Sequence, residues 1–345
     1  NSVDGNTAIG QNALDAATTG DVNVAVGKNA LTDLTTGASN VAVGKDAGAN
    51  ITTGSNNTAI GQGALTTVTT ASNNTAVGKN ALTANTTGAA NIAIGGNSLD
   101  ANTSASSNVA VGYDALTSNT TGDQNTAVGG YALDTNTTGE YNVAVGYAAL
   151  DANTTASNNT GVGYHSLKSN TDGSSNTAVG SLCLDSNTTG SNNTAMGVRA
   201  INDCTTGASN SGFGVQALRY NTTGSYCTAI GSLALRDNTT ANNNTAVGYA
   251  AMQSNSTGTE NTAVGKSALN AGTTGSYNTA VGTGAMQSGT VTGNKNDAFG
   301  FNAGHNISTG TSNTCIGTQT MDSLTTGNYN VAIGVAALQA IGDDS

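Results

Sequence analysis

The chain has 345 residues and a formal net charge of −11, with 8% charged and 4% aromatic residues, 47 glycines, and neither proline nor tryptophan. The acidic charge argues against a nucleic-acid partner, because phosphate binding needs clustered lysine and arginine. No apolar run approaches the roughly 20 residues of a membrane-spanning helix, so membrane insertion is not expected.

A 17-residue repeat runs through the sequence. A pentapeptide of the Asn-Thr-Ala-Val-Gly type begins at Asn6 and recurs every 17 residues up to Asn330, except for one step of 18 residues from Asn278 to Asn296. So short and strict a period is typical of a solenoid, in which each repeat forms one coil. We expect an all-β protein with a single domain over residues 1–345: a parallel β-solenoid of about twenty 17-residue coils, with one 18-residue coil at 278–295.

Each coil, numbered from position 1 at its first residue, begins with a predicted strand. Position 2 is mostly Thr or Val, position 3 is mostly Ala, position 4 is mostly Val or Ile, and position 5 is Gly in all twenty copies. This alternation has the period of 2 expected of a strand. It predicts a core formed by the apolar residue at position 4 and by the Leu that most coils carry at position 9. An unvarying Gly indicates a positive φ or a close approach of another backbone.

Turn-forming residues follow, with Asn-Thr-Thr-Gly common at positions 12–15. We expect two or three short strands per coil, and at about 4.8 Å per coil the array would be a rod on the order of 95 Å long. Asn at position 1 and Thr at positions 13 and 14 are expected to form hydrogen-bonded ladders along the axis. The 18-residue step predicts a one-residue bulge in the turn between Gly289 and Lys295.

Position 12 differs between the middle and the ends of the array. It is Asn from Asn85 to Asn187 but apolar near both ends, including Leu34, Ile51, Ile307, Leu324 and Ile341. Two interpretations are open: extra core near the termini, or end-specific contact with another copy, which makes these five residues candidate assembly residues. No cap is evident at either end, so we expect either a piece of a longer fibre or end-to-end stacking into a homopolymer.

No catalytic constellation is evident. His165 and His305 lie many coils apart, and the sequence has neither a GxSxG elbow nor a phosphate-binding loop. The four cysteines fall at different coil positions, which argues against a disulfide framework and a metal site. Asp134 and Asp151 share position 10, where calcium would relieve their repulsion, but solvated surface carboxylates are the simpler interpretation. We therefore expect no enzymatic activity, no cofactor and no metal.

Four tyrosines are the best candidates for contact with a glycan or a partner chain. Tyr113, Tyr147 and Tyr164 occupy position 6, and Tyr141 occupies position 17. Tyr141 and Tyr147 flank one predicted strand, so their rings would be presented from the same region. The alternative is that they are ordinary exposed tyrosines.

The strand motif resembles the head repeats of YadA-type trimeric autotransporter adhesins, and also the Asn/Thr/Gly-rich repeats of phage tail fibres and bacterial surface proteins. The matching segments are 24–27 and 41–44, both Val-Ala-Val-Gly, and 92–95, Ile-Ala-Ile-Gly. The resemblance implies a left-handed β-roll and a location outside the cell or on a cell or virion surface. The adhesin repeat is shorter, so a 17-residue coil implies a wider cross-section, and no functional residue carries over.

These features lead us to expect a structural subunit of an extracellular filament or adhesive fibre, as a homo-oligomer or an end-to-end homopolymer. One alternative is a phage tail-fibre shaft that binds glycans. Another is an ice-binding β-solenoid. That idea is weakened because ice-binding arrays need outward Thr at alternating strand positions, whereas the Thr residues at positions 13 and 14 are adjacent.

Overall fold

The computed structural model describes residues 4–339, in which twenty three-residue strands and no helix occur. The chain divides into two compact units, Asn1–Ser174 and Ser175–Ser345. The strands of the first unit are β1 (Thr7–Ile9), β2 (Val24–Val26), β3 (Val41–Val43), β4 (Thr58–Ile60), β5 (Thr75–Val77), β6 (Ile92–Ile94), β7 (Val109–Val111), β8 (Thr126–Val128), β9 (Val143–Val145) and β10 (Thr160–Val162). Those of the second are β11 (Thr177–Val179), β12 (Thr194–Met196), β13 (Ser211–Phe213), β14 (Thr228–Ile230), β15 (Thr245–Val247), β16 (Thr262–Val264), β17 (Thr279–Val281), β18 (Asp297–Phe299), β19 (Thr314–Ile316) and β20 (Val331–Ile333).

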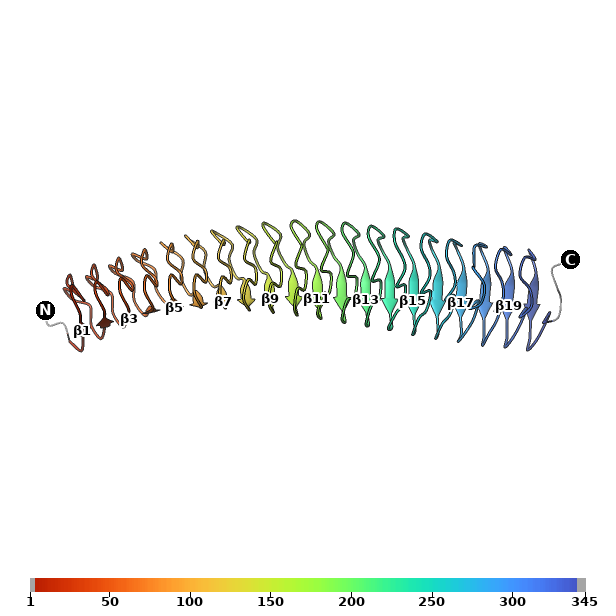
Figure 1. Cartoon of the computed structure of the whole chain (residues 1–345), viewed down its shortest axis with the longest axis horizontal. Coiled ribbons are helices and arrows are strands. Elements are labelled where there is room, and N and C mark those ends of the chain that lie inside the picture. Colours follow the sequence, from red (N-terminus) through yellow and green to blue (C-terminus); the bar gives the residue numbers. More distant parts are fainter. Residues whose placement is uncertain (1–3, 340–345) are drawn as a thin grey trace. The chain divides into compact units, whose positions relative to one another are not determined.

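Each unit is a parallel β-solenoid, as predicted. Within the first unit every strand pairs in parallel with the next at a register of 17 residues, as in Thr126↔Val143. The second unit repeats this pattern, as in Thr228↔Thr245. Figure 1 shows the strands of each unit side by side, with one loop per strand. The prediction of two or three strands per coil is wrong, because in residues 4–339 each coil has a single strand and its other sides are turns.

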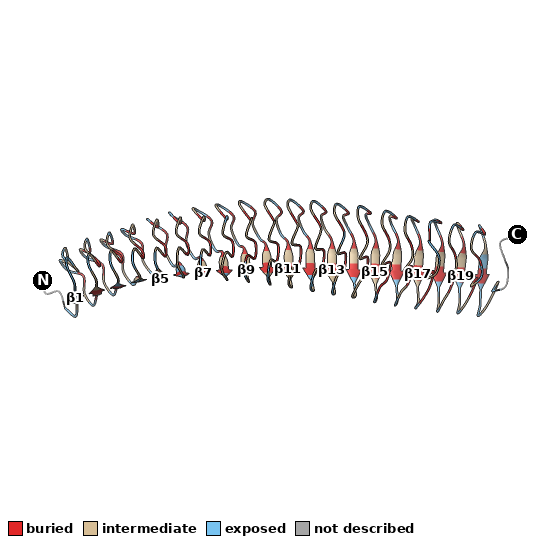
Figure 2. Ribbon diagram, viewed as in Figure 1, coloured by how far each residue is buried: buried red, intermediate tan, exposed pale blue. Residues whose placement is uncertain are grey.

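The interior of the coil contains position 3 and not position 4. The middle residue of nearly every strand is buried while its two neighbours are half-buried or exposed, as Figure 2 shows by the red and tan bands of the arrows. Ala127 is 0% exposed, whereas Val128 is 37% exposed. The predicted Val or Ile core at position 4 is therefore wrong. Little space remains beside position 3, because the Leu side chain of position 9 fills the interior. A Cβ placed on Gly161, at position 3, would lie 3.4 Å from Cγ of Leu150.

The Leu at position 9 is the large core residue, as predicted. Leu133 and its equivalents are buried except in the first and last coils, where Leu14 and Leu338 are half-buried. They have positive φ, 53° at Leu133, which is rare for a residue with a branched side chain. Position 8 is usually a buried Ala, so the turn after each strand places two apolar side chains inside.

The predicted Asn ladder is present at position 1. Nδ2 of Asn125 donates to the carbonyl oxygen of Gly139 in its own coil (2.8 Å), and its Oδ1 accepts from the backbone N–H of Asn142 in the next coil (2.9 Å). Asn193 makes the same pair of bonds in the second unit. These amides satisfy buried backbone groups that would otherwise destabilise the interior.

A second Asn ladder, which was not predicted, runs at position 12. Nδ2 of Asn136 donates to Oδ1 of Asn119 at 2.8 Å and to the carbonyl oxygen of Gly139 at 3.0 Å. Thr at position 13 forms the expected ladder through the backbone, since Oγ1 of Thr120 donates to the carbonyl oxygen of Thr137 (3.0 Å). Position 14 instead lies on the surface, as Thr121 does.

The extra residue of the 18-residue coil lies where the sequence predicted it. The Nδ2 of Asn278 reaches a carbonyl 15 residues ahead, at Gly293, instead of 14. Before the extra residue, the backbone N–H of Ser288 still donates to the carbonyl oxygen of His305 in the next coil. After it, Val291 pairs with Gly272 of the preceding coil. The extra residue therefore lies between these two contacts, at Gly289–Thr290. Gly289 has φ 96°, and Val291 re-enters the core with no exposure.

Candidate functional site

The turn after each strand forms a surface edge with a repeating groove. Positions 7 and 9 both have positive φ, 59° at Tyr131 and 53° at Leu133. This winding directs position 9 inward and leaves positions 6, 7 and 10 at the surface. In the first unit two pockets form along this edge, and both are lined by residues of positions 7 and 10.

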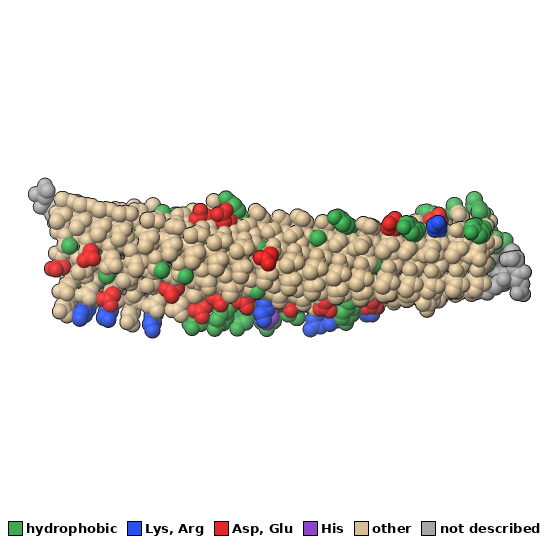
Figure 3. Space-filling view, turned by 90° about the horizontal axis from the view of Figure 1, so that it is seen from above, with side chains coloured by type: hydrophobic (Ala, Val, Ile, Leu, Met, Phe, Trp, Pro, Cys, Tyr) green, Lys and Arg blue, Asp and Glu red, His purple; other side chains and the backbone are tan. Residues whose placement is uncertain are grey.

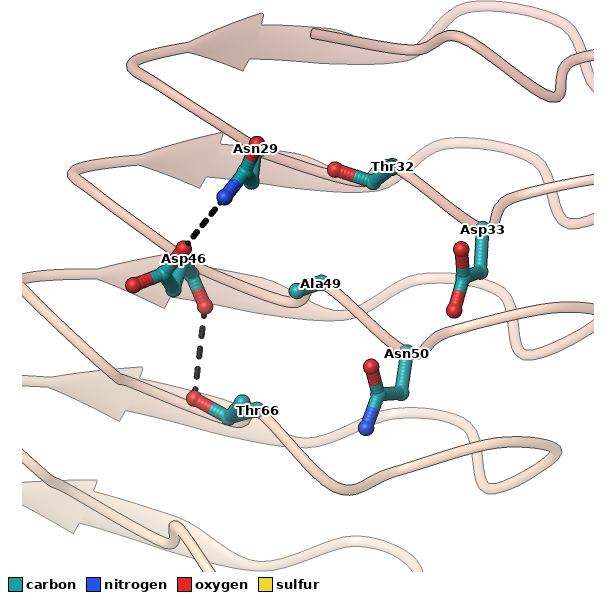
Figure 4. A pocket seen from close by; sticks show the side chains of 7 residues that line it. All are labelled: Asn29, Thr32, Asp33, Asp46, Ala49, Asn50 and Thr66. Atoms are coloured by element: carbon teal, nitrogen blue, oxygen red, sulfur yellow. Dashed lines mark hydrogen bonds between the residues drawn. The ribbon is translucent and has the colours of Figure 1, made fainter. Parts of the chain in front are cut away.

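The first pocket is polar and has a volume of about 380 Å³. Figure 4 shows Asn29 and Asp46 on one side of it and Asp33 and Asn50 on the other, with Ala49 between. The Asn29 amide donates to the Asp46 carboxylate at 2.8 Å, and this bond lowers the pKa of Asp46 below its ordinary value. The carboxylate also lies 3.2 Å from Nζ of Lys45. The Asp46 carboxylate of this pocket is thus already engaged within the protein.

The second pocket, which we call the aromatic groove, has a volume of about 440 Å³ and spans three successive coils. Its lining residues are Tyr131, Asp134, Tyr147, Ala148, Asp151, Tyr164, His165 and Lys168. Ala148 is the small residue between Tyr131 and His165 at position 7, so the groove opens where one coil lacks a large side chain.

A row of rings forms one wall of the aromatic groove. Tyr131 contacts Tyr113 and Tyr147 edge to face, with ring centroids 5.8 Å and 5.6 Å apart. Tyr147 stacks on Tyr164 at 6.0 Å, and Tyr164 stacks on His165 at 3.8 Å. These ring contacts favour ordered aromatic side chains at the surface. Figure 3 shows hydrophobic and acidic side chains gathered along one edge of the molecule.

The opposite wall carries two half-buried carboxylates and a lysine. Burial raises the pKa of Asp134 and of Asp151 above the ordinary value, and the Asp151 charge raises that of Asp134 further. Lys168 acts in the opposite direction on Asp151. Both carboxylates lie at the surface but are half-buried, because they line the groove.

The four candidate tyrosines do not form one group. Tyr113, Tyr147 and Tyr164 belong to the ring row, whereas Tyr141 lies at position 17, half exposed, and makes no ring contact within residues 4–339. Sequence reasoning missed Tyr131 and His165. The sequence did offer one indication of Tyr131. Position 6 is Tyr in the coils of Tyr113 and Tyr147 but Gly130 in the coil between them, and the ring of Tyr131, one residue later, contacts both tyrosines.

The candidate assembly residues lie inside their coils. Leu34, Ile51 and Ile307 are 0% exposed and Leu324 is 3% exposed, while Ile341 lies outside the described residues. Each apolar side chain takes the place that Asn fills in the position 12 ladder. The structure therefore gives these four side chains almost no surface through which to touch another chain.

His305 has two polar neighbours in the second unit. Oγ of Ser288 and Nε2 of His305 are hydrogen-bonded at 3.0 Å, and Nδ1 lies 3.8 Å from Oδ1 of Asp322. The order Ser, His, acid resembles a hydrolase triad, but the second distance is too long for the hydrogen bond that orients the imidazole. None of these three residues lines either of the two pockets described above.

The cysteines are buried and unpaired with one another. Burial raises the pKa of Cys183 and Cys315 to about 12 and that of Cys204 and Cys227 to about 11. Their thiolates are thus scarce at neutral pH. Within residues 4–339 no three His, Cys, Asp or Glu side chains converge so as to hold a metal ion.

Comparison with known proteins gives no relative: no family model matches the chain, and no curated protein matches its sequence. The part of the chain that the structure describes contains no helix able to cross a membrane.

Proposed function

We propose that this chain is a structural, non-enzymatic protein: a subunit or shaft segment of an extracellular filament or adhesive fibre, at a cell or virion surface, in which copies of the chain associate. The observation that carries the proposal is the outward face of the strands. The coil-to-coil ladders supply a repeated backbone on which this face is displayed. The resemblance of the strand motif to surface-fibre repeats supports the location.

The strand face combines a column of apolar residues at position 4 with a column that is mostly Thr or Val at position 2, and it is almost free of charge. Positions 2 and 4 both point away from the core, and Ile60, Ile94 and Val128 in the first unit are 37–40% exposed. Met196, Ile230 and Phe299 in the second unit are 40–48% exposed. Asp297 is the one charged residue at these two positions within residues 4–339. A column of partly exposed apolar side chains that repeats from coil to coil favours an interaction site.

A second copy of the chain fits this face on grounds of charge and spacing. With a net charge of −11, two copies repel one another through most of their surfaces. The strand face offers an approach with little repulsion, and its side chains repeat at the strand spacing of about 4.8 Å, which an identical face matches. Burial of apolar surface contributes about 25 cal/mol per Å² of apolar area.

The test is a pair of charged double variants examined by sedimentation velocity and electron microscopy. Ile94→Lys with Val128→Lys places charge on the strand face, while Thr87→Lys with Thr121→Lys adds the same charge at exposed position 14. We expect oligomers or filaments from the natural chain and the position 14 variant, and monomers from the strand-face variant. A natural chain that stays monomeric, or a strand-face variant that still assembles, would contradict the proposal.

Ice binding is a second candidate, favoured by position 2 of the second unit. Thr194, Thr228 and Thr245 are half-buried at this outward position, alternating with the apolar residues of position 4. The objection from adjacent Thr residues at positions 13 and 14 does not apply to this column. Thermal hysteresis of the natural chain, lost in Thr228→Lys, would favour ice binding, and an absence of hysteresis in the natural chain rules it out.

A further inference from the structure

The aromatic groove is a gap in a repeating surface. At position 7 the coils on either side of Ala148 carry Tyr131 and His165, so the missing side chain leaves a slot between two rings. Ala148 itself is 4% exposed and forms the floor. A slot with rings at its sides accepts a flat, ring-shaped group better than an extended chain.

The carboxylates on the far wall have free acceptor capacity. In the part of the chain that the structure describes, neither the Asp134 nor the Asp151 carboxylate accepts a hydrogen bond. Asp114 and Asp46 differ, because Asn97 and Asn29 donate to them. A half-buried carboxylate that accepts no hydrogen bond destabilises the folded chain. A ligand that donates a hydrogen bond to it therefore gains more binding free energy than it would at a solvated carboxylate.

The charges of the groove disfavour an anionic ligand. Asp134 and Asp151 repel an anion, and Lys168 at the end of the same column offsets part of their charge, so a neutral ligand meets no net repulsion. Tyr147 and Tyr164 are each 51% exposed, and the aromatic surface that their ring contacts leave open suits apolar C–H groups. A sugar ring combines C–H groups on one face with hydroxyl donors and acceptors at its edge.

We propose that the aromatic groove binds a neutral saccharide, with a sugar ring in the slot above Ala148, its C–H face against Tyr147 and Tyr131, and its hydroxyls donating to Asp134 and Asp151. Lys168 donates to a sugar oxygen at the other end. The site lies within one unit and uses no residue of the strand face, so the proposal does not depend on the association of copies.

The experiment is a calorimetric and saturation-transfer NMR titration of the full chain with defined tetrasaccharides. The neutral probes are the tetramers of N-acetylglucosamine, of β-linked and α-linked glucose, and of mannose. The tetramer of glucosamine serves as the cationic counterpart of the first, and sialyl-lactose as an anionic probe. We expect at least one neutral probe to bind at millimolar concentration or below, and the anionic probe to bind at least tenfold more weakly.

The decisive variant is Ala148→Leu, which fills the slot. The chain already carries Leu182 and Leu233 at position 7, with φ of 56° and 63°, so Leu is compatible with this backbone. The matched control is Ala250→Leu at the same position in the second unit, where the floor residue is also 4% exposed. We expect at least a tenfold loss of affinity in the first and none in the second.

Two further variants test the walls. Tyr147→Ala should weaken binding at least tenfold, whereas Tyr249→Ala, at the same position of a distant coil, should leave it unchanged. Asp134→Asn should weaken binding several-fold while circular dichroism shows an intact fold. The proposal is overturned if no neutral probe binds, if only a charged probe binds, or if Ala148→Leu and Tyr147→Ala bind as the natural chain does.

Discussion

Glycine occupies two positions of the coil for different reasons. At position 5, Gly129 has φ 136°, and a Cβ there would also meet the carbonyl oxygen of Gly146 in the next coil. At position 15, a Cβ on Gly122 would meet the carbonyl oxygen of Gly139, but the backbone φ is not positive. The chain itself shows the difference, since it places Ala at position 15 in four coils, at Ala71, Ala105, Ala156 and Ala241.

This difference predicts unequal costs for one substitution. Gly129→Ala should destabilise the first unit by at least about 2 kcal/mol, because the backbone is strained and cannot move away from the facing carbonyl. Gly122→Ala should cost about 1 kcal/mol or less, since the chain already carries Ala at the same position of other coils, at Ala105 and Ala156. Urea unfolding followed by circular dichroism measures both. Equal costs would show that close approach, and not φ, keeps position 5 invariant.

The carboxylates of the two pockets predict opposite effects of pH. Burial raises the pKa of Asp134 above the ordinary 3.8, so the folded chain holds that proton more tightly than the unfolded chain. Stability is therefore lost as pH rises from about 3.8 through the folded pKa, and it stays lost at neutral pH. Asp134→Asn should unfold at a higher temperature than the natural chain at pH 7, and the difference should vanish below pH 3.8.

Asp46→Asn is the control with the reverse sign. The hydrogen bond from Asn29 lowers the pKa of Asp46, so ionised Asp46 stabilises the fold above its ordinary pKa of 3.8, and the gain is lost as pH falls through the folded pKa. This variant should melt at a lower temperature than the natural chain at pH 7 and match it in acid. If both variants shift the melting temperature in the same direction at pH 7, the burial argument for Asp134 fails.

At the scale of the element, each coil is fastened to the next by side-chain amides as well as by its strand. The ladder at position 1 is interrupted once, at Cys227. Its backbone N–H is still bound by Oδ1 of Asn210 at 3.0 Å, and its thiol lies 3.3 Å from the carbonyl oxygen of Ala241. The backbone N–H of Asn244 faces the sulfur, which is a weaker acceptor than an amide oxygen.

Restoring the amide should therefore stabilise the second unit. We expect Cys227→Asn to raise the free energy of unfolding by about 1 kcal/mol, the usual net contribution of a buried hydrogen bond. The measurement is the urea midpoint of the variant against the natural chain. Cys183→Asn is a fitting control, because position 8 faces the core without joining the ladder, and a destabilisation is expected there. If Cys227→Asn instead lowers the free energy of unfolding, the coil has repacked around the smaller thiol and no longer has room for the amide.

The period of the sequence predicted the coil, its strand and the 18-residue step, but not which strand residues face inward. Alternation shows that positions 2 and 4 share a face, and the larger apolar residues suggest that this face is buried. The outcome depends on the residue at position 9, such as Leu150, which enters the core and leaves room only for a small residue at position 3. The Leu side chain reaches the core only because its backbone has positive φ, and the conformational preferences of Leu predict a negative φ.

The aromatic groove was only partly predictable for the same reason. Tyr113, Tyr147 and Tyr164 share position 6, so their spacing was visible in the sequence. Tyr131 lies one position later, and its contact with Tyr113 and Tyr147 depends on the left-handed backbone at position 7. Positions 7 and 10 lie opposite one another because of the backbone conformation of the turn, and residue types alone do not reveal this arrangement.

At the scale of the whole molecule, charge opposes the association that we propose. The chain carries 20 acidic and 9 basic residues, while the strand face has one charged side chain in residues 4–339. Repulsion between copies thus acts through groups outside the proposed contact. Such repulsion weakens as salt shortens the screening length, from about 30 Å at 0.01 M to about 8 Å at 0.15 M.

Salt should consequently strengthen self-association. Between 0.01 M and 0.5 M sodium chloride we expect the association constant to rise at least tenfold by sedimentation velocity, because apolar contact persists while repulsion is screened. The Ile94→Lys, Val128→Lys variant should show no such rise. Association that weakens with salt would indicate that ion pairs, and not the strand face, hold the copies together.

The two Asn ladders make one coil interchangeable with another. Each of these interior bonds either lies within one coil or joins a residue to its equivalent one coil away, so duplicating or deleting 17 residues leaves each remaining amide with a partner of the same kind. Growth by gene duplication then requires no new packing solution, and the surface positions of a copied coil are free to diverge. A gap such as the one at Ala148 needs a single codon change in one copy, so a lineage could acquire or relocate a binding groove while every other coil stays as it was.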